Sequence, residues 1–340
     1  MDRLPIALAL TLLLTITLVG CASRVITQSP GPGHQDPELK DFAIIARDGY
    51  RLPLRHWPAK TSPQAVVLAV HGFNDHGGSF EILAESLTER GISVYAHDQR
   101  GFGTTAQRRL WPGQERLAED VKTISRLLRK RYPRTPLYLV GNSMGAAVVM
   151  LALSGNDSPP VDGSVLISPA VWGQSAMPWY QRLGLWLGVR LFPSTTFSAR
   201  MTRRLGIEPT DDPEIKQLLA KDPLILRSAR VDTLYGVSRM MDDALKAAPR
   251  LTGPLLIMYG EEDQIIPPEA ICDMLERLPD SEATPWRMAI YPAGYHMLDR
   301  YTGRAQTHAD IASWLLDPQA PLPSQHEVAL SEARRRLCNC

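Results

Sequence analysis

Short, continuous apolar runs recur along the chain, and stretches with helical periodicity separate them. The runs cover residues 65–70, 92–96, 137–140, 164–167 and 255–258. Strands that are buried on both faces of a parallel sheet show such continuous runs. Residues 42–54 differ, because they surround Asp48-Gly49, a turn dipeptide that predicts a hairpin at the edge of the sheet. The pattern predicts an α/β fold with a mostly parallel, doubly wound sheet.

The alternation of strands and helices stops after Pro169. Residues 171–250 contain no convincing strand, which predicts a helical insertion between two core strands. Three tryptophans, Trp172, Trp179 and Trp186, fall seven residues apart within this insertion. Their rings either pack the insertion onto the body or form an exposed apolar lid, and the sequence allows both for different residues.

The same pattern divides the chain into segments. Residues 40–170 and 251–317 form the two parts of one core, and a helical cap of residues 171–250 separates them. Residues 21–39 are polar and rich in Pro and Gly, which predicts a flexible tether. Residues 318–340 combine prolines with an arginine cluster, and we expect them to form a tail outside the core.

Residues 1–20 differ from the rest of the chain in composition. The apolar run over residues 6–19 has the length of a signal-peptide core and is too short to span a bilayer comfortably. It ends in Leu-Val-Gly-Cys21, which resembles a bacterial lipobox. The resemblance implies that Cys21 begins the mature protein and carries acyl chains, such as palmitate, that anchor it in the cell envelope. By the same resemblance, Ala22 after the cysteine favours the outer membrane, facing the periplasm. The alternative is an ordinary secretory signal with an incidental cysteine.

Charge and cysteine usage exclude several classes of protein. The formal net charge is +1, which argues against a nucleic-acid-binding protein. Cys272 lies in a helical pattern and is expected to be a buried thiol. Cys338 and Cys340 are too close to bridge without strain, so we expect a disulfide to another cysteine, or none. The spacing of His and Cys suggests no metal site, and we expect no cofactor and no obligatory protein partner.

The chemistry of the chain starts at the pentapeptide of residues 141–145, Gly-Asn-Ser143-Met-Gly. It has the G-x-S-x-G form, it follows an apolar strand directly, and small and apolar residues typical of a buried helix come after it. Strand, tight turn and helix are the context of a nucleophile elbow, and the glycines permit the turn. A serine nucleophile needs an imidazole that takes its proton and a carboxylate that orients the imidazole.

Three histidines follow this serine in the chain. His296 lies in a glycine-containing loop after an apolar run, which is where a catalytic base belongs in such a sheet. His308 falls within a helical pattern, and His326 lies in the expected tail, so His296 is the predicted base. Glu262 and Asp263 both follow the apolar run that ends near residue 259, and spacing alone does not separate these two carboxylates.

Five segments together resemble one family. They resemble motifs of the monoacylglycerol lipase/lysophospholipase group, which belongs to the α/β-hydrolase superfamily and is of the serine aminopeptidase S33 type. The segments are residues 71–80, 98–103, 141–145, 260–263 and 294–296. The resemblance covers roughly residues 40–316. It implies an α/β-hydrolase fold with a helical cap, favours Asp263 over Glu262, and implies Ser143, Asp263 and His296 as the catalytic triad.

An oxyanion that forms during acyl transfer needs fixed N–H donors. The backbone N–H groups of Met144 and Phe73 are the predicted pair, and the resemblance implies the same two. His71 and His76 lie in the loop of Phe73, but they lack a third ligand for zinc, so structural roles are expected. Ala146 departs from the second glycine that these enzymes often have, with little expected consequence.

The predicted function is hydrolysis of carboxylic esters by a membrane-anchored serine hydrolase. The apolar cap and the lipid anchor favour a lipid-derived ester, such as a monoacylglycerol or lysophospholipid, and the cap could contact acyl chains or the membrane surface. A small-ester carboxylesterase is one alternative. A peptidase similar to proline iminopeptidases is another, with Asp211, Asp212 and Glu214 as candidate ligands of a substrate amine, although these residues fit a loop and helix start better. A non-catalytic surface lipoprotein is the third alternative.

Overall fold

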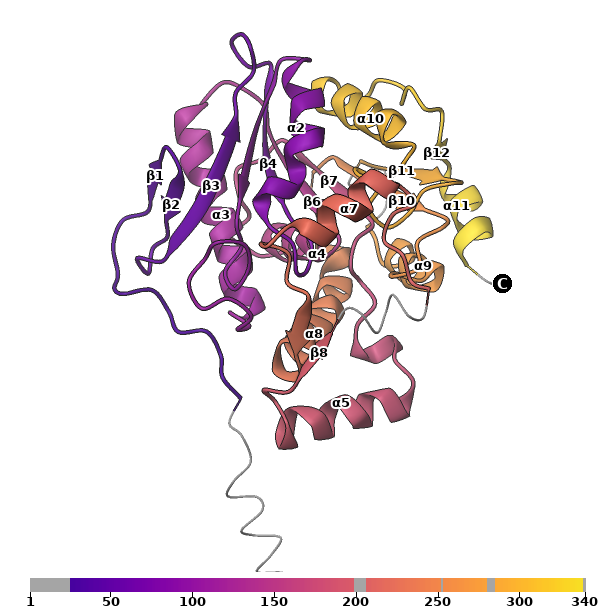
Figure 1. The fold of residues 1–340 in the computed structure, drawn as a ribbon. Helices are drawn as coiled ribbons and strands as arrows, with labels where there is room; N and C mark the ends of the chain where they lie inside the picture. Colours follow the sequence, from indigo (N-terminus) through magenta and orange to yellow (C-terminus); the bar gives the residue numbers. More distant parts are fainter. Residues whose placement is uncertain (1–24, 199–205, 252, 280–284, 339–340) are drawn as a thin grey trace, which may run out of the picture.

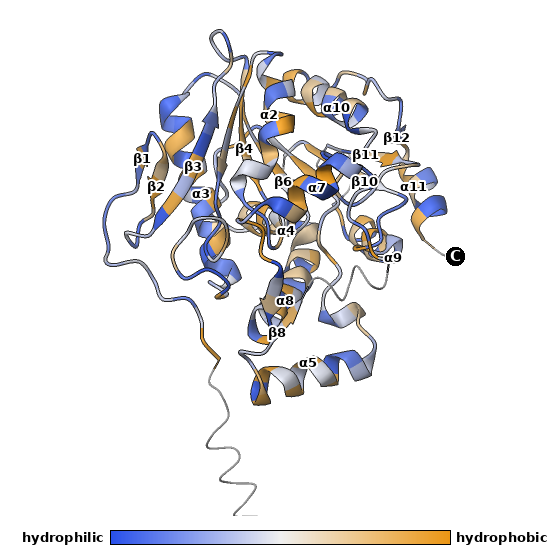
Figure 2. Cartoon of the chain, viewed as in Figure 1, coloured by the Kyte–Doolittle hydropathy of each residue, from blue (hydrophilic) through white to orange (hydrophobic). Residues whose placement is uncertain are grey.

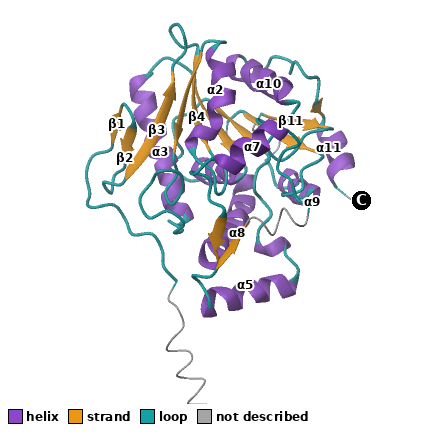
Figure 3. Ribbon diagram, in the orientation of Figure 1, coloured by secondary structure: helices purple, strands orange, loops and turns teal. Residues whose placement is uncertain are grey.

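The computed structural model describes residues 25–198, 206–251, 253–279 and 285–338. Within them, a ten-stranded sheet forms the centre of the molecule, in the order β1-β2-β3-β5-β4-β6-β7-β10-β11-β12 (Figures 1 and 3). Its strands are β1 (Glu38–Lys40), β2 (Ala43–Ile45), β3 (Arg51–Trp57), β4 (Ala65–Val70), β5 (Ile92–His97), β6 (Leu137–Asn142), β7 (Gly163–Ile167), β10 (Leu255–Gly260), β11 (Trp286–Tyr291) and β12 (Glu327–Val328).

The sheet is antiparallel at its edges and parallel in its middle. Strands β1, β2, β3 and β5 pair antiparallel, β5 to β11 pair parallel in the order given, and β12 returns antiparallel along β11. The predicted hairpin lies between β2 and β3, and Gly49 at its turn has a φ of 77°. The predicted doubly wound, mostly parallel sheet is therefore confirmed.

Helices cover both faces of the sheet and bury alternate residues of each strand. Helices α2 (Glu81–Thr88) and α10 (Arg304–Leu316) pack on one face, and α3 (Gln114–Arg131), α4 (Met144–Leu153), α8 (Val231–Ala247) and α9 (Pro268–Leu275) pack on the other. In β4, Val66 and Leu68 belong to one cluster, whereas Val67 and Ala69 belong to the opposite one. This period of two explains the continuous apolar runs in the sequence.

The insertion after β7 carries helices α5 (Trp179–Leu191), α7 (Pro213–Lys221) and α8, with short 3-10 turns at Gln174–Ala176 and Ala248–Arg250. It also contains a two-stranded antiparallel ribbon of β8 (Thr196–Ser198) and β9 (Ser228–Arg230). The expectation of an insertion without strands is therefore wrong. Strands of three residues leave no apolar run in the sequence, since β8 is exposed throughout and β9 buries only Ala229.

The start of the described chain is attached to the core. Gln28 is buried, its backbone N–H donates to the carbonyl of Trp111 at 3.0 Å, and its side-chain amide donates to the hydroxyl of Tyr50 at 3.2 Å. The flexible-tether prediction is therefore wrong for residues 25–39, because specific hydrogen bonds hold this polar segment. The predicted signal peptide and Cys21 lie outside the described residues.

The expected tail is also part of the core. Strand β12 extends the sheet, and α11 (Leu330–Leu337) packs on α9 with Ala333 and Leu337 buried. Cys338 forms a disulfide with Cys272, so the prediction of a free thiol at Cys272 is wrong, whereas a bridge to another cysteine is confirmed. The apolar residues of α11 have helical spacing, but arginines lie between them, so the sequence pattern indicates a polar tail.

Candidate active site

Ser143 lies at the junction between β6 and α4. Its φ of 52° and ψ of −116° are uncommon for a residue with a side chain, and such backbone strain clusters at functional sites. Three backbone hydrogen bonds hold it: its N–H donates to the carbonyl of Ile167 at 2.9 Å, and its carbonyl accepts from the N–H groups of Ala170 at 3.1 Å and Ala147 at 3.2 Å. The sharp turn therefore presents the Ser143 hydroxyl at the carboxyl end of the sheet.

The glycines on both sides of Ser143 are needed for space. A Cβ atom on Gly145 would lie 1.9 Å from the carbonyl oxygen of Val70, and one on Gly141 would lie 2.6 Å from the Cα of Ala146. Both distances are far inside van der Waals contact with backbone atoms, which cannot move aside. Ala146 stands where related enzymes often have a second glycine. Its methyl group is fully buried in the core, so the fold has room for it.

His296 lies in the loop after β11, between the other two residues of the predicted triad. Its Nε2 is 2.8 Å from the Ser143 Oγ, and its Nδ1 is 2.7 Å from the Asp263 Oδ2. A carboxylate can only accept, so Nδ1 carries the proton and Nε2 of the neutral ring accepts from the serine hydroxyl. The ring is thus in the tautomer that a general base for Ser143 requires.

Asp263 follows β10 and has a fully buried side chain. While its Oδ2 faces His296, its Oδ1 accepts from the backbone N–H groups of Ile265 at 2.8 Å and Ile266 at 2.9 Å. Glu262 is exposed, and only its backbone N–H takes part here, donating to the carbonyl of Gly294 at 2.9 Å. Of the two carboxylates that the sequence left open, the structure brings Asp263 to the histidine.

Two backbone segments border the Ser143 hydroxyl. Met144 is the first residue of α4, so its N–H has no acceptor within the helix and lies at the positive end of the helix dipole. Gly72 lies beside Ser143, since a Cβ on it would be 3.4 Å from the serine Cβ. The adjoining Phe73 is half-buried, with its ring edge-on to Phe102. Both predicted oxyanion donors therefore lie in segments that flank the nucleophile.

Buried charged residues that the sequence analysis missed hold the loops of Phe73 and His296 in place. Asp75 accepts from Arg300 at 2.6 Å, and Asp299 accepts from the side-chain amide of Asn142 at 2.9 Å. Burial is the largest single influence on Asp75 and would raise its pKa, but the positive charge of Arg300 and the hydrogen bonds from Ser79 and Arg300 together hold the pKa below its usual value. Asp75 and Arg300 are 225 residues apart, so no local spacing in the sequence indicates that they pair. The available signal was a charged residue in each of two loops close to the predicted site.

The other histidines that the sequence analysis weighed have structural partners. His71 is buried, its Nδ1 is 2.8 Å from the Gly72 carbonyl, and its Nε2 accepts from the N–H of Gln99 at 3.0 Å. Burial lowers the pKa of His71, in keeping with this neutral ring. His76 contacts Asp222, and His308 donates from Nε2 to the backbone carbonyl of Asp299 at 2.8 Å. His326 lies edge-on to the ring of Tyr291.

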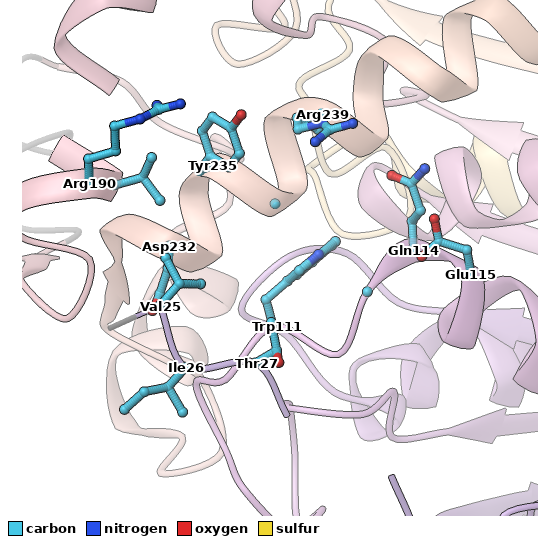
Figure 4. Close-up of a pocket in the computed structure, with 13 residues that line it drawn as sticks. Val25, Ile26, Thr27, Trp111, Gln114, Glu115, Arg190, Asp232, Tyr235 and Arg239 are labelled. Atoms are coloured by element: carbon cyan, nitrogen blue, oxygen red, sulfur yellow. The ribbon is translucent and has the colours of Figure 1, made fainter. Parts of the chain in front are cut away.

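Among the described residues, one cluster contains cysteines at metal-ligand distances, but its sulfurs are not free to bind a metal ion. Cys272, Cys338 and Glu276 lie close together, but both sulfurs are used by the disulfide. A cavity of about 620 Å³ lies elsewhere, between residues 25–27, the start of α3 and the cap helices α5 and α8 (Figure 4). None of the triad lines it, so it does not define the reacting site.

The sheet order, the elbow and the Ser-His-Asp hydrogen bonds define the class of the protein: an α/β hydrolase with a serine site. Residues 61–300 match the family described as "Serine aminopeptidase, S33", and the chain belongs to this family.

Curated relatives and solved structures agree with this class. The chain is 24% identical to a rat monoglyceride lipase, covering 90% of this chain and 97% of that protein, and 25% identical to a Mycolicibacterium smegmatis monoacylglycerol lipase, covering 79% and 94%. The solved monoacylglycerol lipase of Paleococcus ferrophilus shares the fold, with a TM-score of 0.64 at 23% identity over 78% of this chain and 98% of that one. The protein is a serine carboxylic ester hydrolase similar to monoacylglycerol lipases.

Proposed function

We propose that the protein hydrolyses lipid-derived carboxylic esters, such as monoacylglycerols or lysophospholipids, through an acyl-enzyme on Ser143. The serine oxygen attacks the acyl carbonyl while His296 Nε2 takes its proton. The tetrahedral intermediate collapses, the ester C–O bond breaks, and His296 returns the proton to the leaving alcohol. Water then attacks the acyl-enzyme with His296 as base, which releases the fatty acid and restores the serine hydroxyl.

Asp263 and two backbone amides assist these steps. The Asp263 carboxylate holds the proton on His296 Nδ1 and stabilises the imidazolium that forms at each transfer. The N–H groups of Met144 and Phe73 would donate to the oxyanion, and each such donor contributes on the order of 3 kcal/mol to lowering the barrier. The observation that carries the proposal is the pair of hydrogen bonds at His296, 2.8 Å to Ser143 and 2.7 Å to Asp263.

The apolar surface of α5 supports a lipid-derived substrate. Trp179 is 69% exposed, and further large apolar side chains of α5 lie exposed beside it: Tyr180, Leu183, Trp186, Leu187 and Leu191. Figure 2 shows this helix at the end of the molecule that lies away from the sheet. Arg182 and Arg190 are its charged residues, so the helix combines apolar side chains with positive charge, as membrane-surface helices do. Trp172 packs against the core, as the packing alternative predicts, whereas Trp179 and Trp186 are exposed and available for the lid role.

Membrane anchoring through Cys21 is part of the same proposal. Val25, where the described chain begins, borders the cavity that Arg190 of α5 also lines, so the N-terminal end and the apolar helix lie on one side of the molecule (Figure 1). A lipid on Cys21 would bring that side toward the bilayer. Among the described residues, no helix is long and apolar enough to cross a membrane. Cys21→Ser should release the protein from the membrane fraction, and a variant that stays bound would contradict lipidation.

The peptidase alternative has little support in the cap. Asp211 accepts hydrogen bonds from the backbone N–H and the hydroxyl of Thr302. Asp212 caps α7 and pairs with Arg304. Because these carboxylates already have partners, they are poorly placed to receive a substrate amine.

Covalent labelling tests the proposed nucleophile. A fluorophosphonate probe should label the wild-type protein and not Ser143→Ala, and labelling that survives this substitution would contradict the assignment. Unlabelled wild-type protein from the same preparation is then assayed in parallel on a long-chain monoacylglycerol, a lysophospholipid, a short soluble ester and a prolyl amide. Preferred cleavage of the short ester would favour the carboxylesterase alternative, and preferred cleavage of the amide would favour the peptidase.

A further inference from the structure

A buried ion pair joins the two loops that carry opposite halves of the proposed site. Asp75 lies two residues after Phe73, and Arg300 lies four residues after His296. The Arg300 Nη2 donates to the Asp75 Oδ2 at 2.6 Å, and the two side chains are only 8% and 6% exposed. The segment with a proposed oxyanion donor is thus connected by one charged contact to the segment with the base.

Each member of this pair is held by further contacts. The second carboxylate oxygen of Asp75 accepts from the backbone N–H of His76 at 2.9 Å and from the Ser79 hydroxyl. Arg300 also lies 3.6 Å from the carboxylate of Asp299, which in turn accepts from the side-chain amide of Asn142. Asn142 directly precedes the nucleophile. The loop that carries the base, the oxyanion segment and the elbow therefore share one buried polar network.

The cap is attached to the same two loops. On the Asp75 side, His76 Nε2 is 2.8 Å from the Asp222 carboxylate, and the N–H of Leu226 donates to the Asn74 carbonyl at 2.9 Å. On the Arg300 side, the Thr210 hydroxyl donates to the Arg300 carbonyl at 2.7 Å. A displacement of the cap would thus pull on both loops, and the ion pair is a direct polar connection between their side chains.

We propose that Asp75 and Arg300 are positioning residues that fix the oxyanion segment relative to His296. The inference rests on the proposed function, because it assumes that Phe73 donates to the oxyanion. Burying a charged pair costs desolvation free energy and is weak grounds for stability, so its position between the loops is the informative feature. The pair sets the separation at which base and N–H donor act on the same tetrahedral carbon, and displacements near 1 Å at such sites reduce rates by about 100-fold.

The test compares Asp75→Asn, Arg300→Gln and the double variant. Turnover of a short soluble ester is measured per active site, with sites counted by fluorophosphonate labelling. Each single variant should lose about 10- to 100-fold in kcat with little change in KM, since a positioning role acts on the transition state. The double variant should lose no more than the worse single variant, because the two side chains act as one unit.

A second readout separates positioning from folding. A trifluoromethyl ketone forms a tetrahedral adduct whose oxyanion occupies the proposed donors, so its inhibition constant should rise in parallel with the loss of kcat. Arg300→Lys keeps the charge and should recover part of both losses. Asp232→Asn is the matched control, because it breaks the buried Arg230–Asp232 pair of the cap and should leave both readouts within about twofold of wild type.

Unchanged kcat per labelled site in both single variants, or losses that multiply in the double variant, would overturn the inference. A kcat loss without a weaker ketone would also overturn it, because the oxyanion segment would then be in place. A wild-type protein that neither reacts with the probe nor cleaves the ester would contradict the proposed function itself. The two failures are therefore distinguishable.

Discussion

Replacing Asp263 by asparagine changes one atom in a site where both oxygens are used. One oxygen faces the Nδ1–H of His296 at 2.7 Å, and the other accepts from the N–H groups of Ile265 and Ile266. The asparagine amide has one oxygen and one NH₂ group. If its NH₂ faced the backbone, two buried donors would lose their acceptor, at a cost of about 1–3 kcal/mol each. The oxygen should therefore stay with the backbone, and the NH₂ should face the histidine.

That orientation inverts the histidine tautomer. Nδ1 of His296 must then accept, the proton moves to Nε2, and Nε2 can no longer take the proton of Ser143. A wrong tautomer in a serine triad reduces kcat on the order of 10⁴-fold, which corresponds to about 5 kcal/mol in the activation free energy. The fold should be retained, because the two backbone hydrogen bonds are kept, so the thermal midpoint should change little.

The assay is kcat/KM on a short soluble ester at neutral pH, with thermal unfolding of each sample. Glu262→Gln is the matched control, because this neighbouring carboxylate is exposed and should change kcat/KM by less than about twofold. A folded Asp263→Asn variant with near-normal turnover would refute the reasoning. A large loss in Glu262→Gln instead would mean that the other carboxylate serves the base.

Three further predictions concern stability. Gly145→Ala should destabilise the protein by more than the roughly 1–3 kcal/mol usual for overpacking, because its Cβ would lie 1.9 Å from the Val70 carbonyl oxygen. Urea unfolding measures the loss of stability, and an unchanged unfolding midpoint would contradict the prediction. Burial would raise the pKa of Asp98, but the hydrogen bond from the backbone N–H of Thr104, the positive charge of Arg55 and the hydrogen bond from the N–H of Gly77 lower it to about 2. Because the folded-state pKa is lowered, the ionised carboxylate stabilises the fold above about pH 4, and about 2–3 kcal/mol of this stabilisation is lost as the pH falls toward 2. The difference in unfolding free energy between wild type and Asp98→Asn should therefore shrink over that range. A constant difference would refute this prediction. Removing the Cys272–Cys338 bridge, which spans 66 residues, should lower the unfolding free energy by about 4 kcal/mol, and an unchanged urea midpoint after reduction would contradict this.

The parallel core could be predicted because burial on both faces leaves a strong signal. The five apolar runs of the sequence correspond to β4, β5, β6, β7 and β10. The positions of Ser143 and His296 could be predicted for a related reason, since both follow strands whose carboxyl ends meet at one edge of the sheet. The choice between Glu262 and Asp263 required geometry, because neighbouring residues of one loop differ only in the direction of their side chains.

The ends of the chain could not be predicted from local pattern. Residues 25–37 are held by scattered hydrogen bonds, such as those of Gln28 to Trp111 and Tyr50, which composition does not reveal. Helix α11 buries few side chains, and the disulfide of Cys338 depends on the tertiary position of α9. The Asp75–Arg300 pair likewise joins loops that only the assembled sheet brings together.

Fatty-acid release from a long-chain monoacylglycerol tests the central claim most directly. The soluble form that starts at Ala22 is assayed beside its Ser143→Ala variant, with a short soluble ester as a second substrate. The account predicts release by the first protein and none by the variant. If the soluble form cleaves the short ester but releases no fatty acid, the lipid-ester proposal is contradicted, and release that survives in Ser143→Ala would contradict the serine mechanism.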